Sequence, residues 1–271
     1  MSTSFLAIAA VILYLASSLL LGLRLARGGS AAELAKRGPL SVGLCALILH
    51  GLVIYQFVVS NNGVNLGVFN ALTLVAWLIA LLLLISAFSQ PIENLGIVIL
   101  PVAAATIFFA LVFPAERLVT GEEPLGIEAH ILTSILAYSI LSIAAVQAML
   151  LAVQDHHLRN RHPGGFIRAL PPLQVMEALL FQMIWLGFIV LSVALLTGLL
   201  FLEDLFAQHL AHKTVLSLAS WCVFGVLLWG RHRFGWRGRI AIRWTLAGLI
   251  VLAIAYFGSK LVLEVMLSGT R

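Results

Sequence analysis

The sequence has few charged residues. Asp, Glu, Lys and Arg make up 10% of its 271 residues, whereas a soluble globular protein carries roughly 25%. Hydrophobic residues make up 62%, and the mean hydropathy is +1.09. A chain with so few charged side chains cannot cover its surface with groups that water solvates. The chain is therefore predicted to be a polytopic membrane protein.

Cysteine is also scarce, and the common catalytic motifs are missing. Cys45 and Cys222 both fall inside apolar runs, where a thiol behaves as a small hydrophobe, and one distant pair makes no disulfide framework. The sequence contains no Cys-x-x-Cys motif, P-loop, dinucleotide fingerprint or recognisable nucleophile–base pair. The chain is therefore not expected to be an enzyme.

What the sequence has instead is a series of long apolar runs. A spanning helix needs about 20 mostly apolar residues, and eight segments qualify. Backbone groups in lipid need partners within their own segment, and the runs are too long for barrel strands, so each is predicted to be helical. The expected fold class is all-α, a polytopic membrane helix bundle forming a single domain over residues 1–271. The eight runs cover about residues 4–23, 39–59, 66–88, 95–113, 129–153, 179–201, 214–231 and 244–266.

Basic residues gather in three loops, which sets the predicted orientation. The loops after the first, fifth and seventh spans hold twelve of the 16 Lys and Arg residues, and alternation of the spans places these loops on one side. By the positive-inside rule that side is cytoplasmic, so both termini face outward. The isoelectric point near 9.7 is explained by this topology signal, and no nucleic-acid partner is predicted. The twelve residues are Arg24, Arg27, Lys36, Arg37, Arg159, Arg161, Arg168, Arg231, Arg233, Arg237, Arg239 and Arg243.

Two of the loops are predicted to be more than connectors. Residues 168–180 begin with a Pro-Pro turn followed by apolar residues at helical spacing, which predicts a cytoplasmic interfacial helix before the sixth span. Residues 201–213 alternate apolar and polar side chains, and are predicted to lie on the outer membrane surface.

His50 lies near the middle of an apolar run, roughly 16 Å along the helix from Pro39. An ionisable side chain at this depth is costly without a partner, and it marks a candidate functional site. One interpretation is a hydrogen bond to a neighbouring helix. The other is metal ligation, most plausibly as an axial ligand of haem b, because imidazole is a common donor to haem iron.

A second axial ligand would come from another span, and His232 at the end of the seventh span is the candidate. It shares a helical face with Trp221 and several small or polar residues, the kind of face that packs inward. Arg231 and Arg233 beside it could pair with haem propionates through charge-assisted hydrogen bonds. The alternative is that His232 is an interface residue and that the arginines act only as a topology signal.

Two further polar residues complete the predicted site. His130 opens the fifth span on the predicted outer side, where His209 and His212 could join it in a second metal or haem site. Solvated loop histidines are the alternative for all three. Asn70 lies in the third span, where a buried asparagine is expected to hydrogen-bond between helices or to line a ligand groove.

Three stretches carry a resemblance to a known family: PPLQVMEALLFQMIWLGF (171–188), SWCVFGVLLWGRHRFGWRGR (220–239) and AYFGSKLV (255–262). The chain resembles the integral-membrane cytochrome c assembly family, and within it the branch of YpjD-like and HemX-like proteins. The resemblance covers nearly the whole chain and implies a haem-handling protein of a bacterial inner membrane. It matches His50 to the family's first transmembrane histidine, Asn70 to a family asparagine and His130 to the first outer histidine. Lys213 matches the lysine of the family's Pro-Lys-Glu element, with His212 in place of the proline.

The sequence also departs from the pattern of the family's synthases. Residues 201–213 contain no tryptophan, although the synthases carry a tryptophan-rich loop there. The second outer histidine corresponds to Leu267, and the second transmembrane histidine to Trp229, with His232 one turn later. We therefore expect a protein that binds or handles haem without synthase activity, with haem and lipid as partners and other membrane proteins as candidate partners. The alternative is a non-haem scaffold or accessory subunit of a membrane complex.

Overall fold

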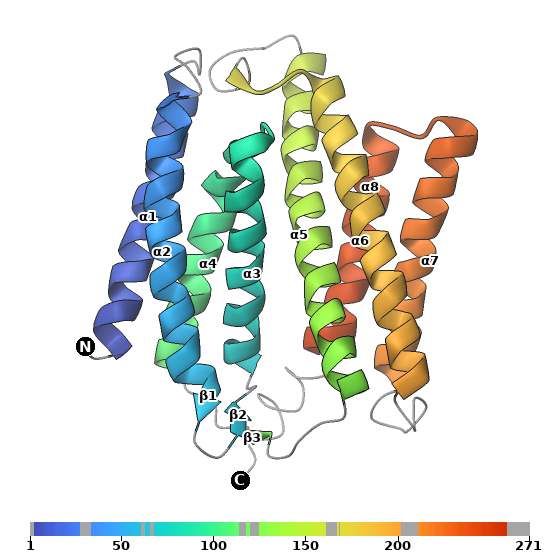
Figure 1. Cartoon of the computed structure of the whole chain (residues 1–271). Helices are drawn as coiled ribbons and strands as arrows, with labels where there is room; N and C mark the ends of the chain where they lie inside the picture. Colours follow the sequence, from blue (N-terminus) through green and yellow to red (C-terminus); the bar gives the residue numbers. More distant parts are fainter. Residues whose placement is uncertain are drawn as a thin grey trace. The chain divides into compact units, whose positions relative to one another are not determined.

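Eight helices, each long and apolar enough to cross a membrane, make up most of the part of the chain that the computed structural model describes (Figure 1). The described residues are 3–27, 34–60, 63–65, 68–113, 118–119, 125–160, 167, 169–201 and 211–258. The helices are α1 (Thr3–Ala26), α2 (Leu34–Val58), α3 (Val68–Ser89), α4 (Gly96–Val112), α5 (Leu125–Arg159), α6 (Leu173–Phe201), α7 (Ala211–Phe234) and α8 (Arg239–Ala253). The predicted all-α bundle of eight spans is confirmed, and the outward direction of the termini stays a prediction.

Short segments of other structure join the helices. A 3-10 turn, η1 (Glu93–Leu95), precedes α4, and a π-helical turn, η3 (Ile254–Gly258), continues α8. Three strands, β1 (Val59–Ser60), β2 (Gly63–Asn65) and β3 (Leu118–Val119), pair antiparallel in the order β1-β2-β3. Runs of two or three residues carry too little pattern to be predicted from a sequence, and they leave the all-α class unchanged.

The helix boundaries bear on one prediction about the loops. The helix expected to lead into the sixth span is the first part of α6, which runs unbroken from Leu173 to Phe201, and its interfacial placement stays a prediction. Pro171 and Pro172 precede the helix, where a proline costs no hydrogen bond, and no proline or glycine interrupts the chain between them and Gly187. At about 1.5 Å per residue, a helix of 29 residues is longer than the roughly 30 Å hydrocarbon layer. Most of the predicted surface loop, residues 202–210, lies outside the described residues.

The chain divides into two compact units. Unit 1 contains Met1–Gly121 and His156–Pro172, and unit 2 contains Glu122–Asp155 and Leu173–Arg271. Unit 1 therefore holds α1 to α4, and unit 2 holds α6, α7, α8 and nearly all of α5. The expectation of a single domain over residues 1–271 stays a prediction.

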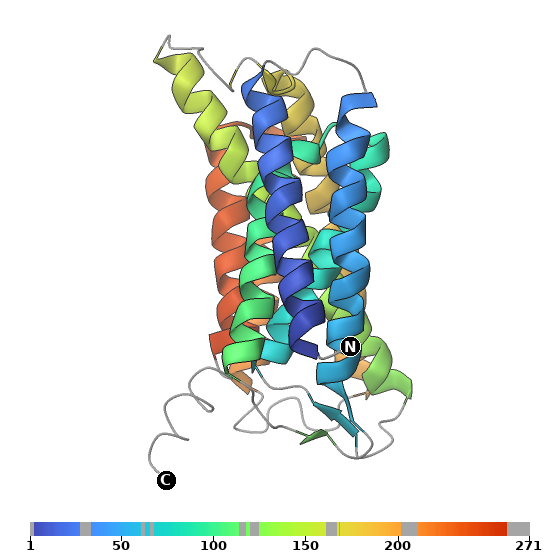
Figure 2. The ribbon, with the colours of Figure 1, turned by 90° about the vertical axis from the view of Figure 1, so that its left-hand side faces the viewer.

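In unit 1, α1 packs against both α2 and α4 (Figure 2). Pro101 lies inside α4 and has no backbone N–H to give to the carbonyl of Ile97. The hydroxyl of Ser18 on α1 donates to this carbonyl at 3.0 Å and so satisfies it. At one end of the same helix pair, Arg24 and Glu93 form an ion pair of 3.2 Å. Polar side chains on α1 thus contact both α4 and the η1 turn that precedes it.

In unit 2, a tight turn joins α7 to α8. Gly235 adopts a positive φ of 68° just after α7, and its N–H donates to the carbonyl of Arg231 at 3.1 Å. This 5→1 bond is that of an αL C-cap, and the N–H of Trp236 donates to the carbonyl of Gly230 at 3.2 Å. A β-carbon at Gly230 would lie 2.3 Å from the Trp236 ring. Glycine is therefore required twice at this turn, once for its backbone conformation and once for space.

Candidate ligand pocket and the predicted haem ligands

Unit 2 contains a cavity of about 440 Å³ between α5, α6 and α7. Cavities of roughly 300–1,000 Å³ with mostly apolar walls are typical of small-molecule sites. Four leucines form much of its wall: Leu195, Leu196, Leu199 and Leu218. It lies toward the end of unit 2 where α6 ends and α7 begins, the end that the sequence predicts to face outward. We call this cavity the unit 2 pocket.

His130 reaches the pocket from the first turns of α5. Its Nδ1 lies 2.8 Å from the carbonyl oxygen of Ala194 on α6. A carbonyl oxygen can only accept, so Nδ1 must carry the proton and donate it, which leaves the lone pair of the neutral ring on Nε2. The described residues give Nε2 no hydrogen-bond partner. Metal-bound histidines usually show this arrangement, with the non-ligating N–H held by a carbonyl or carboxylate.

Gly198 explains how the His130 ring can lie so close to α6. A β-carbon at position 198 would lie 2.9 Å from Cε1 and 3.0 Å from Nδ1 of His130. Real side chains rarely tolerate such contacts, so a larger residue at this position would push the ring away from the carbonyl of Ala194. The backbone of α6 therefore supplies both the hydrogen-bond acceptor and the space that fix the imidazole.

Trp221 on α7 lines the pocket in a fixed position. Its Nε1 donates to the hydroxyl of Ser192 at 2.8 Å, and that hydroxyl donates to the carbonyl of Phe188 at 2.8 Å. The Trp221 ring also stacks on Phe188, with ring centroids 5.4 Å apart. Ser192 lies six residues before Gly198 on α6, about 9 Å along the helix. The Trp221 ring, fixed by Ser192, therefore forms a rigid aromatic wall of the pocket. This wall lies deeper along α6 than Gly198, farther from the end of the helix at Phe201.

His50 has different surroundings in unit 1. Its side chain is completely buried, with 0% exposed, and its Nδ1 lies 3.2 Å from the hydroxyl of Tyr14 on α1. The two rings meet edge to face, with centroids 5.7 Å apart. The described part of the chain offers Nε2 no partner, although this atom is buried. Because the ring has no exposed surface, iron could approach Nε2 only after neighbouring side chains move.

Asn70 joins α3 to α2 in unit 1. Its Nδ2 donates to the carbonyl of Phe57 at 3.5 Å, and Trp77 donates to the carbonyl of Leu47 at 3.0 Å. The Asn70 bond agrees with the first of the two expectations for this residue, a hydrogen bond between helices. Trp77 also covers Gly51, where a β-carbon would lie 3.3 Å from the indole nitrogen. Asn70 and Trp77 thus tie α3 to the helix that carries His50.

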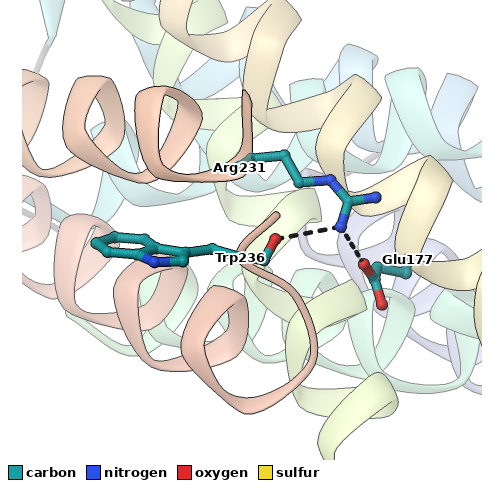
Figure 3. Close-up of polar contacts among 3 residues, drawn as sticks. All are labelled: Glu177, Arg231 and Trp236. Carbon is teal, nitrogen blue, oxygen red and sulfur yellow. Dashed lines mark hydrogen bonds and ion pairs between the residues drawn. The ribbon is translucent and has the colours of Figure 1, made fainter. Parts of the chain in front are cut away.

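The predicted ligands at the end of α7 lie at the opposite end of unit 2 from the pocket. His232 and Arg233 are exposed, while Arg231 donates to Glu177 at 2.7 Å and to the carbonyl of Trp236 at 3.2 Å (Figure 3). The Arg231 guanidinium also lies 4.5 Å from the centre of the Phe181 ring. Arg231 therefore holds the α7–α8 turn against α6, a contact that the sequence pattern did not indicate.

The structure thus brings part of the predicted site together. His130, Trp221 and Lys213 line one pocket in unit 2, where His212 is exposed and His209 lies outside the described residues. His50 and Asn70 belong to unit 1, and the pairing of His50 with His232 stays a prediction. The sequence analysis missed Ser192 and Gly198, although small residues on a spanning helix often mark close approach of another element. No cluster of three metal-ligating side chains occurs among the described residues.

Comparisons with known proteins agree with this membrane architecture. Residues 40–267 match the family described as cytochrome c assembly protein. Inner membrane protein YpjD from Escherichia coli (strain K12) is 32% identical over 237 residues, which cover 85% of this chain and 88% of YpjD. No solved structure matches.

More distant relatives carry a functional name. Cytochrome c biogenesis protein CcsA from Synechococcus sp. (strain CC9902) is 23% identical, over 82% of this chain and 83% of that protein. The protein of the same name from Chlamydomonas reinhardtii is 24% identical, over 82% of this chain and 65% of that protein. The match to the family covers most of the sequence, including most of α2 and all of α3 to α8. This multi-pass membrane protein belongs to the cytochrome c assembly protein family.

Proposed function

We propose that this protein holds or passes haem b in a bacterial inner membrane, without synthase or other enzymatic activity. The observation that carries the proposal is His130 on the wall of the unit 2 pocket, with Nδ1 donating to the carbonyl of Ala194 and Nε2 in no hydrogen bond with the described residues. Family membership supports haem handling in general, because distant relatives are named cytochrome c biogenesis proteins. The departures from the synthase pattern support the absence of synthase activity.

The residues of the pocket fit a haem group. His130 would hold the haem iron through its neutral imidazole, and its hydrogen bond to the carbonyl of Ala194 fixes both the tautomer and the ring orientation. Trp221 offers a rigid aromatic surface, and the leucine walls would exclude water from a planar apolar ring. Bound haem would contribute an iron centre, whose reactivity and redox potential depend on its axial ligands and on the polarity of the pocket.

The predicted role of His50 as a ligand requires a rearranged unit 1, because its ring is packed and hydrogen-bonded to Tyr14. The same contact favours the second candidate function, a non-haem scaffold in which His50 joins two helices. The two functions make different demands on His130. If the protein binds haem, the His130 imidazole is required for binding. If the protein is a scaffold, neither His130 nor the pocket is required for its function.

The decisive experiment is a hemin titration of the detergent-purified protein, followed by the Soret band. We expect saturable binding by the wild type and at least about tenfold weaker binding by His130→Ala, since the axial bond is lost. His212→Ala is the matched control, because that histidine is exposed at the same end of unit 2. Absence of saturable binding by the wild type, or equal binding by His130→Ala, would overturn the proposal and favour the scaffold.

A further inference from the structure

The turn between α7 and α8 carries more positive charge than the surrounding acidic residues neutralise. Five arginines lie in or beside this turn, whereas the sequence has no Asp or Glu from position 205 to position 263. Arg231 pairs with Glu177 on α6 at 2.7 Å. Arg239 pairs with Asp155 on α5 at 3.2 Å. The other three are exposed and form no ion pair with the described residues, and we call them the turn arginines: Arg233, Arg237 and Arg243.

An aromatic cluster occupies the same stretch of the chain. The ring of Phe234 meets that of Trp229 edge to face, with centroids 5.2 Å apart, and stacks on Trp236 at 6.2 Å. Trp236 also contacts Trp244 at 5.5 Å, and its side chain extends away from Glu177 (Figure 3). None of the three indole N–H groups donates a hydrogen bond to the part of the chain that the structure describes. Tryptophans with an apolar body and an available N–H are typical of the interface between lipid and water.

The exposed side of α7 leads from this cluster toward the other end of the helix. Four exposed residues follow one another at intervals of four, three and four positions: Cys222, Val226, Trp229 and Arg233. This spacing places them in one stripe along the helix. From Val226 to Arg233 the stripe extends about 10 Å and changes from apolar to aromatic to cationic. A phospholipid presents its acyl chain, glycerol region and phosphate in the same order.

We propose that this surface binds an anionic phospholipid. The phosphate lies at Arg233 and Arg237, the glycerol region contacts Trp229, and an acyl chain follows the apolar part of the α7 stripe. Both α7 and α8 are long and apolar enough to cross a membrane, so lipid is the natural neighbour of their exposed faces. A guanidinium can bind a phosphate through two parallel N–H donors, and an indole N–H can donate to a phosphate or ester oxygen.

Two features favour an anionic lipid over a basic loop that acts only as a topology signal. A topology signal requires positive charge near the end of a span, but no ordered aromatic cluster beside it. A zwitterionic headgroup carries a cation of its own, which the turn arginines repel, whereas an anionic headgroup has none. The surface is therefore expected to distinguish lipids by the net charge of the headgroup. This inference does not depend on haem binding.

The test measures lipid binding to the detergent-purified full chain by native mass spectrometry. Phosphatidylglycerol and phosphatidylcholine with the same acyl chains are titrated into the wild type and into Arg233→Gln/Arg237→Gln. The matched control, Arg37→Gln/Arg159→Gln, removes the same charge from two exposed arginines outside the turn. We expect the wild type to prefer phosphatidylglycerol about tenfold, the turn variant to bind it about tenfold more weakly, and the control to stay within about twofold. The preference should fall as salt concentration rises.

A second pair of variants tests the aromatic part of the surface. Trp229→Leu keeps an apolar side chain and removes the indole, and it should weaken phosphatidylglycerol binding about threefold. Trp185→Leu is the matched control, because the Trp185 ring is 52% exposed and that of Trp229 is 58% exposed. Trp185 lies twelve residues into α6, about 18 Å along the helix from its first residue. We expect no change in lipid affinity in the control.

Three results would overturn the inference. Equal affinity of the wild type for the two lipids, or equal losses in the turn variant and its control, would leave the arginines as a topology signal alone. Displacement of phosphatidylglycerol by inorganic phosphate at a similar concentration would indicate an ion site to which the acyl chain contributes nothing. A shift from dimer to monomer in Trp229→Leu, with unchanged lipid affinity, would make the surface a contact with a second copy of the chain. None of these results affects hemin binding through His130, so the inference and the proposed function can fail separately.

Discussion

His50 in unit 1 and His130 in unit 2 are both histidines of spanning helices, yet their surroundings are opposite. The His50 ring is completely buried against Tyr14 and has no exposed surface. The His130 ring is half-buried on the wall of a cavity of about 440 Å³. Each ring has one nitrogen in a hydrogen bond and one without a partner among the described residues.

The comparison teaches that an unengaged imidazole nitrogen is not enough to identify a ligand site. A ligand also needs space, and at His50 that space is filled by packed side chains. The partners differ as well, because a tyrosine hydroxyl can donate or accept, whereas a backbone carbonyl can only accept and so fixes the tautomer. The His130 imidazole therefore lies on a pocket wall with its tautomer fixed, whereas the His50 ring joins α1 to α2.

The largest expected effect separates the two histidines by stability. His50→Ala should lower the free energy of unfolding by about 3 kcal/mol, because it opens a cavity in a packed region and leaves the Tyr14 hydroxyl without its partner. It should change hemin affinity by less than about twofold. The measurement is denaturant unfolding in detergent, followed by circular dichroism, beside the hemin titration. His130→Ala is the reciprocal control, with a stability change within about 1 kcal/mol. If His50→Ala abolishes the pigment and His130→Ala does not, the assignment of the two residues is reversed.

The second prediction concerns the space that Gly198 leaves for His130. Gly198→Ala should weaken hemin binding about tenfold, because the new β-carbon would displace the ring from the carbonyl of Ala194. Alanine favours a helix more than glycine does, so the helix itself should not suffer. Gly225→Ala is the matched control, since a β-carbon there would lie 3.5 Å from Phe188, an ordinary contact. Equal affinities of the two variants, measured by Soret titration, would show that the position of the ring does not matter.

The sequence predicts the spans well because the thickness of the bilayer sets their length and composition. It could not predict the partner of His50. Tyr14 lies 36 residues earlier, and its contact with His50 depends on how α1 and α2 are rotated against each other. The family match begins at residue 40, so α1 lies outside it, and a comparison with the family would not have identified Tyr14 either.

The unit 2 pocket was predictable only in part. His130, Trp221 and Lys213 could each be selected by residue type, by helical face or by the family resemblance. Their common pocket depends on the space that three helices leave open, and no local pattern encodes a volume. Arg231 shows the reverse case, because its basic loop suggested propionate binding or topology, while its structural contacts are with Glu177 and the backbone of Trp236.

The third prediction sharpens the contrast between the two ends of unit 2. Arg231→Met should lower the free energy of unfolding by about 1 kcal/mol. Breaking a fully buried pair costs about 3–5 kcal/mol, but the Arg231 side chain is 37% exposed and solvent screening reduces the effect. The Arg239–Asp155 pair, with side chains 51% and 31% exposed, is the matched control, and Arg239→Met should cost less than about 0.5 kcal/mol. Denaturant unfolding measures both variants. If Arg231→Met loses hemin affinity without losing stability, the prediction that Arg231 pairs with a haem propionate is supported instead.

The smallest expected effect isolates the hydrogen bond that distinguishes His50 from His130. Tyr14→Phe keeps the ring packed against His50 and removes only the hydroxyl. Hydrogen bonds between membrane helices contribute about 0.6 kcal/mol on average, because the same polar groups also form hydrogen bonds in the unfolded state within the membrane. We therefore expect a loss of about this size in the free energy of unfolding, and none in Tyr55→Phe, whose ring is 65% exposed. Hemin binding through His130 should be unaffected in both variants. A Soret band that grows stronger in Tyr14→Phe, and disappears when His50→Ala is added, would mean that Tyr14 restrains a ligand instead of merely joining two helices.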